Sequence, residues 1–218
     1  MPRVSISPGE HYHIFNRGVN KQVIFLNTAE YIRMLFLILF LQAPIPFPNV
    51  GRQVGYFQRN KNFKVNQVDL TKIIKKRQIE LCAFAIMPNH VHLLLHELKE
   101  GGISAYMQRI EIAYTKYFNI KHERSGYLFQ GPFQSVHVVS NEQLLHLSAY
   151  IHLNPTELTL WKKKPADYPW SSYQDFAAHN RWGELLSTEI LLGQFKNQNG
   201  YVEFVETSGA KGFKPGLL

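Results

Sequence analysis

The stretch at residues 79–87 (IELCAFAIM), the dipeptide Pro88–Asn89 and the stretch at residues 91–96 (VHLLLH) decide the fold of this 218-residue chain. Both stretches are short, apolar and bounded by turn residues, as buried strands are. Proline presets its backbone angle and asparagine tolerates tight turns, so the dipeptide predicts a sharp corner. The sequence therefore predicts two neighbouring strands joined as a hairpin.

Hydrophobic periodicity and capping signals predict the other elements on either side of this hairpin. Upstream lie a strand at residues 11–16 and a helix at residues 28–42, with Thr28 as N-cap and Glu30 in the first turn. Downstream lie a helix at residues 103–119, a strand at residues 133–139, and a helix that starts after Ser140 and stops at Pro155. This order predicts an α+β fold, a ferredoxin-like and RRM-like four-stranded antiparallel sheet with two packing helices and one added helix.

Residues 1–163 form the predicted domain, and two segments stand apart from the pattern. Residues 43–51 (APIPFPNVG) hold three prolines, which exclude a helix and open a loop insertion over about residues 43–77. Inside it, Leu70, Ile73 and Ile74 predict a short amphipathic helix. Residues 164–218 are expected to form a partly helical C-terminal tail, with a weak helix around residues 189–195.

The composition excludes several classes of protein. Hydrophobic residues make up 45% of the chain, so its bulk is not intrinsically disordered. The single cysteine, Cys82, excludes an internal disulfide and a cysteine zinc cluster and favours a cytoplasmic location. The most apolar run, residues 34–41 (MLFLILFL), is far shorter than the roughly 20 residues of a membrane span. A net charge of +8 suits a polyanionic partner.

The triplet His90–Val91–His92 carries the first chemical signal. Residues two apart on a strand project from the same face, with Cα atoms about 7 Å apart, so two imidazoles can converge on one cation. Val91 then points to the opposite, buried face. An ordinary strand with two half-exposed histidines would show the same pattern, and the chain has ten histidines.

A second signal lies on the helix that follows Ser140. Gln143, His146, Tyr150 and Asn154 share one stripe of this helix, at spacings of three and four. A phenol and a carboxamide one turn apart, on a face able to meet the sheet, would place a nucleophile beside a metal ligand. Alternatively, Tyr150 simply packs in the core with its hydroxyl at the rim.

Taken together, these motifs resemble a known family. The run Pro88–His92 (PNHVH) followed by residues 150–155 (YIHLNP) is similar to the single-tyrosine HUH transposases of insertion sequences, and in particular to the REP-associated tyrosine transposases. The likeness extends from residues 12–18 (YHIFNRG) to residues 168–173 (YPWSSY). The family loop usually reads Gln-Gly-Arg-Phe-Lys, whereas residues 130–134 here are QGPFQ and lack both cations.

The resemblance implies a function for residues 1–163 as a catalytic domain. His90 and His92 would be metal ligands, Asn154 a further ligand and Tyr150 the nucleophile. The implied reaction is the cleavage and transfer of single-stranded DNA near hairpins through a 5′-phosphotyrosine, with Mg²⁺ or Mn²⁺ as cofactor. The partner would be single-stranded DNA with palindromic hairpins, bound by a monomer or homodimer associated with a bacterial nucleoid.

Substrate binding has its own candidate residues. Lys72, Lys75, Lys76 and Arg77 would track phosphates, although a solvated helix face explains them equally well. Tyr127, in a glycine-containing loop, would stack on a base. The resemblance alone suggests Asn16 and Arg17 as contacts to a hairpin foot.

Two other functions compete with this one. A ferredoxin-like module that binds DNA or RNA without catalysis would stack bases on sheet aromatics. The stretches at residues 79–87 and 91–96 lack the aromatic-rich motif that this needs, and they are interpreted as core and metal face. A relaxase shares the histidine pair but generally carries its tyrosine ahead of the histidines, whereas Tyr150 follows them here.

Overall fold

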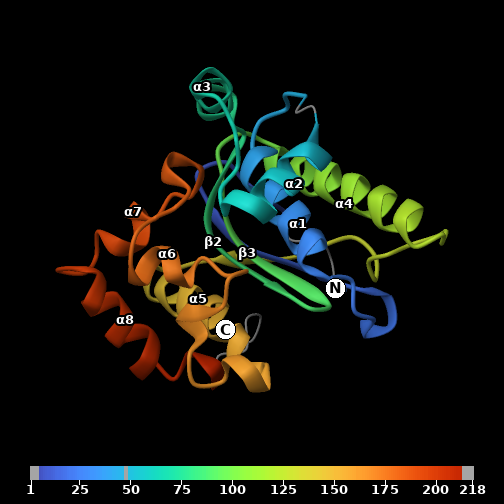
Figure 1. Cartoon of the computed structure of the whole chain (residues 1–218). Coiled ribbons are helices and arrows are strands. Elements are labelled where there is room, and N and C mark those ends of the chain that lie inside the picture. The colour runs from blue at the N-terminus through green and yellow to red at the C-terminus, as the bar shows by residue number, and fades with distance from the viewer. Residues whose placement is uncertain (1–4, 47–48, 213–218) are drawn as a thin grey trace.

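A four-stranded sheet forms the centre of the computed structural model, which describes residues 5–46 and 49–212 (Figure 1). The order of the strands is β2-β3-β1-β4, and every neighbouring pair is antiparallel. This is the predicted ferredoxin-like arrangement, and the α+β fold is confirmed. The strands are β1 (His11–Arg17), β2 (Ile79–Met87), β3 (His90–Glu97) and β4 (Gln134–Val138).

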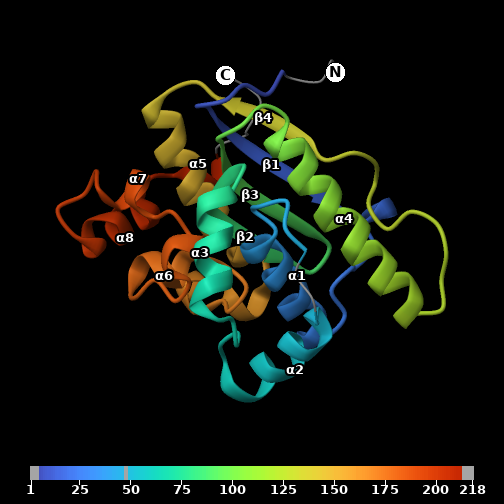
Figure 2. The ribbon, with the colours of Figure 1, turned by 90° about the horizontal axis from the view of Figure 1, so that it is seen from above.

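Helices cover both faces of this sheet. Figures 1 and 2 show α1 (Thr28–Phe40) and α4 (Gly102–Lys121) on one face and α5 (Asn141–Leu153) on the other. Two buried tyrosines of α4 connect it to α1 and to the segment before α1. Tyr106 Oη donates to the Ile38 carbonyl and Tyr114 Oη donates to the Ile24 carbonyl, each at 2.6 Å.

The predicted corner at Pro88–Asn89 is confirmed as a two-residue turn, because Met87 pairs directly with His90. The segment that leaves β1 holds this turn in place. The Pro88 carbonyl accepts from the backbone N–H groups of Ile24 and Phe25, and the Asn89 carbonyl accepts from that of Gly18. These bonds fix the start of β3 against the end of β1.

The start of α1 differs in one detail from the prediction. The helix begins at Thr28, but Asn27 occupies the N-cap position instead of Thr28, and its side chain makes no capping bond. The buried carboxylate of Glu30 takes over, accepting from the Leu26 backbone N–H at 2.6 Å and from the Asn27 side chain at 2.9 Å. Lys121 of α4 donates to the same carboxylate at 2.7 Å.

The expected loop over residues 43–77 is wrong in part. The short amphipathic helix predicted from Leu70, Ile73 and Ile74 is confirmed as α3 (Gln67–Lys76), but a second helix, α2 (Val50–Asn60), is unexpected. The prolines end at residue 48, so the helix begins just beyond them, at positions 50 and 51 that the prediction excluded. Val54 and Phe57 of α2 are buried, and Figure 2 shows α2 beside α1. Tertiary packing therefore stabilises a helix with few apolar residues of its own.

Residues beyond Lys164, expected to be a partly helical tail, pack against α5 and β2. They form α6 (Tyr173–Ala177), α7 (Glu189–Leu192) and α8 (Gln198–Thr207). Residues 168–172 run along the edge of β2, where the Ile86 N–H donates to the Trp170 carbonyl and the Ser172 N–H to that of Phe84. Thus the YPWSSY motif covers an open sheet edge.

Short 3₁₀ turns complete the described chain. They are η1 (Val19–Lys21), η2 (Asn154–Glu157), η3 (Thr159–Trp161), η4 (Pro165–Asp167), η5 (Gly183–Leu185) and η6 (Ala210–Gly212). No helix within residues 5–46 and 49–212 is long and apolar enough to cross a membrane.

A buried polar network attaches this C-terminal segment to α5. The ring of His152 contacts the Ser172 hydroxyl through Nε2 at 2.8 Å and the Tyr201 hydroxyl through Nδ1 at 2.7 Å. Tyr201 Oη also donates to the hydroxyl of Ser148 at 3.0 Å. All four side chains are fully buried, and the two ring nitrogens of His152 have Ser172 and Tyr201 as their partners, whereas both serine hydroxyls also bond to backbone groups.

The substitution Tyr201→Phe tests this network. It leaves His152 Nδ1 and the Ser148 hydroxyl without their buried partner, which costs about 1–3 kcal/mol of unfolding free energy. Urea denaturation measures the loss, with Tyr127→Phe as control because the Tyr127 side chain is 86% exposed. Equal stability of the two variants would contradict a structural role for the network.

Acid is expected to destabilise the fold through His152. Burial lowers the pKa of His152 from 6.5 to about 3. Below about pH 6.5 the unfolded chain binds a proton that the folded chain does not, so stability falls as the pH drops, by up to about 1.4 kcal/mol per pH unit. Urea unfolding followed between about pH 7.5 and pH 5 should show a shallower decline for His152→Gln. A decline identical to that of the wild type would exclude His152 as its source.

Candidate active site

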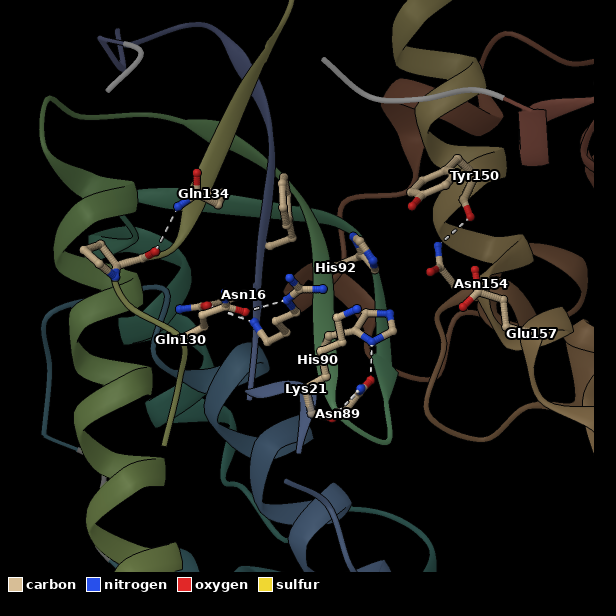
Figure 3. A pocket seen from close by; sticks show the side chains of 13 residues that line it. Asn16, Lys21, Asn89, His90, His92, Gln130, Gln134, Tyr150, Asn154 and Glu157 are labelled. Atoms are coloured by element: carbon tan, nitrogen blue, oxygen red, sulfur yellow. Dashed lines mark hydrogen bonds between the residues drawn. The ribbon is translucent and has the colours of Figure 1, made fainter. Parts of the chain in front are cut away.

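A cavity of about 710 Å³ opens where β3 begins and β1 ends. It is lined by both histidines of the HVH triplet, His90 and His92, and by two of the four residues predicted on the stripe after Ser140, Tyr150 and Asn154; Gln143 and His146 do not line it. The antiparallel register explains the meeting on the sheet side, because Arg17 of β1 lies opposite His90. Tyr150 and His92, which are 58 positions apart in the chain, thus line the same cavity (Figure 3).

The two histidines lie on the face of β3 that α5 covers. Their ring centroids are 4.9 Å apart and the ring planes cross at 85°. Each ring uses Nδ1 for a contact inside the protein: His90 with Asn89 Oδ1 at 2.7 Å, and His92 with His13 Nε2 at 2.8 Å. The Nε2 atoms of both rings therefore stay available for a ligand in the cavity.

Burial keeps both imidazoles uncharged. It lowers the pKa of His92 well below its usual value of 6.5, and the neighbouring His13 and His90 lower it further. Burial also lowers the pKa of His90, and the Asn154 amide only partly offsets the effect. A neutral imidazole is the form that binds a metal ion, so near pH 7 neither ring has to lose a proton first.

Tyr150 extends from α5 over the histidines. Its ring lies 5.6 Å from that of His92, centroid to centroid, in an edge-to-face arrangement (Figure 3). The side chain is half-buried and contributes to the cavity wall, unlike the core tyrosines of α4. Burial raises the pKa of Tyr150, and the carboxylate of Glu157 raises it further, so the phenol is protonated near neutral pH.

Asn154 follows Tyr150 by one helical turn. It keeps right-handed helical backbone angles (φ −50°, ψ −42°) although Pro155 follows it, because the chain continues there as a 3₁₀ turn. Its side-chain NH₂ donates to the Tyr150 carbonyl at 2.8 Å. With its nitrogen engaged, the carboxamide presents its oxygen toward the histidine pair (Figure 3).

These side chains are suited to an open metal site rather than a closed one. Two neutral imidazoles and one amide oxygen leave several coordination positions for phosphate oxygens or water. Within residues 5–46 and 49–212, no three His, Cys, Asp or Glu side chains gather closely enough to hold an ion by themselves. The set therefore matches a site that the substrate would complete.

Two cations lie at the mouth of the cavity. Arg17 is exposed and donates from Nε to Gln130 Oε1 at 2.7 Å, and Lys21 lines the opening. Asn20 and Lys21 both adopt left-handed backbone angles (φ 52° and 58°), which side chains with a Cβ rarely adopt. The Asn89 side chain donates to the Lys21 carbonyl at 2.9 Å, which fixes this turn beside His90.

Sequence reasoning missed four contributors: Lys21, Asn89, Glu157 and His13. Asn89 belongs to the PNHVH motif, which gave a usable signal. His13 lies within the stretch at residues 12–18 (YHIFNRG) that resembles the family. Lys21 and Glu157 have no such signal, because their positions depend on how the end of β1 and the turn after Asn154 meet β3.

Asn16 lines the cavity, but hydrogen bonds within the protein occupy its side-chain NH₂ group. Its Nδ2 donates to Glu111 Oε1 at 2.7 Å and to the Gly131 carbonyl at 3.0 Å. It thereby holds the loop of residues 130–134 against β1. Pro132 and Gln134, which stand where the resembled family has cations, also line the cavity, so its positive charge comes from Arg17 and Lys21 instead.

The other DNA-contact candidates lie elsewhere. Tyr127 is 86% exposed and lines a neighbouring hollow of about 880 Å³ between its loop and α4. Lys72, Lys75 and Lys76 are exposed on α3, which Figure 1 shows at one extremity of the molecule. The length of β2, roughly 30 Å for nine residues, separates them from the hairpin corner. Arg77 is ion-paired with Glu80.

Comparisons with known proteins agree with this geometry. The family described as "Transposase IS200 like" matches residues 53–154, just under half of the chain, a range that includes both histidines, Tyr150 and Asn154. A solved structure of a REP-associated tyrosine transposase bound to a REP hairpin has the same fold, with a TM-score of 0.51 and 19% identity over 80% of this chain and 82% of that chain. A search of curated proteins finds no match. The resemblance to the IS200-like transposases that the PNHVH and YIHLNP motifs predict is thus confirmed.

Proposed function

We propose that this chain is an endonuclease and strand transferase for single-stranded DNA that cleaves near hairpins through a covalent link to Tyr150. The observation that carries the proposal is the meeting of the Tyr150 phenol with the His90 and His92 imidazoles in one cavity. The family match supports the transposase class, and the REP hairpin in the similar structure supports a hairpin as substrate.

The chemical step is a transesterification. Tyr150 Oη attacks the phosphorus of a DNA phosphodiester, the bond from phosphorus to the 3′-oxygen breaks, and a 5′-phosphotyrosine and a free 3′-hydroxyl result. The phenol releases its proton to solvent, and the departing 3′-oxygen takes one up. One phosphodiester replaces another, so resealing by a 3′-hydroxyl needs no nucleotide cofactor.

The residues around Tyr150 prepare this step. His90, His92 and Asn154 would hold a divalent ion, Mg²⁺ or Mn²⁺, which supplies electrophilic polarisation of the scissile phosphate. Arg17 and Lys21 at the mouth attract the phosphate backbone without entering the neutral interior. Because the pKa of Tyr150 is raised, the phenol is protonated near neutral pH and needs nearby positive charge to lose its proton during the attack.

A binding module without catalysis has less support. Such a module would need sheet aromatics open to bases, whereas β3 is buried at six of its eight positions and carries no aromatic other than histidine. The phenol and the imidazoles also face the cavity rather than an open sheet surface.

The substitution Tyr150→Phe is expected to abolish the covalent protein–DNA product, a loss on the order of 10³-fold or more, because no other group replaces the nucleophile. A labelled library of hairpin oligonucleotides with randomised single-stranded flanks is incubated with Mn²⁺ and resolved on a denaturing gel. Tyr56→Phe on α2, remote from the cavity, serves as control and should react normally. Undiminished cleavage by Tyr150→Phe would overturn the nucleophile assignment.

His90→Ala is expected to lower cleavage by on the order of 100-fold or more while hairpin affinity and thermal stability stay close to the wild type, because it removes one metal ligand. His137→Ala on β4 is the matched control, since His137 contacts Glu10 outside the cavity. Chelation of the wild type should reproduce the His90→Ala result. Cleavage that survives both treatments would exclude a metal-assisted mechanism.

A further inference from the structure

His13 of β1 is a buried histidine with no role in the step described above. Its side chain is 1% exposed, and its Nε2 lies 2.8 Å from Nδ1 of His92. The two rings are nearly parallel, with centroids 5.0 Å apart and an angle of 18° between the planes. Phe15 and Tyr150 pack on the other sides of the His13 ring at 4.8 and 6.0 Å.

The contact with His92 explains why position 13 carries an imidazole rather than an apolar side chain. Nδ1 of His13 is buried, and no described residue lies within hydrogen-bond distance of it. A half-satisfied imidazole in an apolar site costs free energy that an aliphatic side chain would avoid. The polarity of His13 therefore serves its hydrogen-bond partner, His92.

His90 shows which ring nitrogen carries the proton in a histidine of this site. The NH₂ group of Asn89 donates to the Lys21 carbonyl, so Asn89 Oδ1 must accept from His90 Nδ1–H. His90 thus carries its proton on Nδ1 and leaves Nε2 with a free lone pair. If both histidines are to hold a metal ion through Nε2, His92 would need the same tautomer.

The hydrogen bond between His13 and His92 has two forms. If His13 donates from Nε2, His92 accepts at Nδ1 and carries a proton on Nε2, which blocks metal binding there. If His13 accepts, His92 carries its proton on Nδ1 and its Nε2 is free. A metal ion on His92 Nε2 would select this second form, in which the neutral His13 ring carries its own proton on Nδ1, a buried atom that faces no described acceptor.

We propose that His13 is a positioning residue whose Nε2 accepts the Nδ1 proton of His92, so that His92 presents a free Nε2 to a divalent metal ion. The proposal rests on the proposed function, which assigns His90 and His92 as ligands. It gives each ligand one fixed acceptor, the Asn89 amide for His90 and the His13 ring for His92.

The variants His13→Gln and His13→Met separate hydrogen bonding from packing. Their side chains have nearly the same length and shape, but only glutamine carries an oxygen that accepts from His92 Nδ1–H. His11→Met is the matched control, because His11 lies on the same strand and face but stacks on His96 and not on His92. Thermal unfolding of each variant verifies that it is folded.

The measurement is Mn²⁺ affinity, read from the electron paramagnetic resonance signal of free Mn²⁺ in a titration of each protein without DNA. We expect Kd to rise about 10–100-fold in His13→Met, and to stay within a few-fold of the wild type in His13→Gln and His11→Met. A wild-type Kd in His13→Met overturns the proposal, and so does an equal loss in the methionine and glutamine variants. If the wild type binds Mn²⁺ no better than His90→Ala, the metal site of the proposed function fails, and this inference fails with it.

Discussion

The packing of α5 across the start of β3 is the constraint on which the site depends. The two histidines share a face because they are two residues apart on a strand, and Tyr150 and Asn154 share a face because they are one helical turn apart. Neither pair makes a site alone. The packing of α5 on the sheet, at the end where the hairpin turns, brings them into one cavity.

Buried polar contacts hold both partners of this packing in position. On the helix side, His152 connects α5 to the segment along β2 and to α8 through Ser172 and Tyr201. On the sheet side, the Pro88–Asn89 turn is bonded to the chain that leaves β1. A cavity assembled from rigid elements keeps its side chains oriented before any substrate arrives, which lowers the entropic cost of reaction.

Charge is distributed in the way that a phosphate-handling site requires. Burial keeps His90 and His92 uncharged, while the cations Arg17 and Lys21 and the carboxylate of Glu157 lie at the exposed edge of the cavity. The basic cluster on α3 lies a full strand length from the corner, so it does not line this cavity. The net charge of +8 is therefore a poor guide to where DNA would be handled.

Local signals in the sequence were sufficient for the four strands and the helices α1, α4 and α5, because each has clear periodicity and strong turn or capping residues. They were also sufficient to nominate His90, His92, Tyr150 and Asn154, since regular spacing on a strand or helix assigns side chains to a face. Helix α2 was missed because Val54 and Phe57 are its only buried residues and α1 supplies the surface that stabilises it. Only the tertiary structure decided that His13, Lys21 and Glu157 adjoin the site, and that the residues after Lys164 pack on α5. Those contacts join segments far apart in the chain, and no local pattern of residues encodes a meeting of distant surfaces.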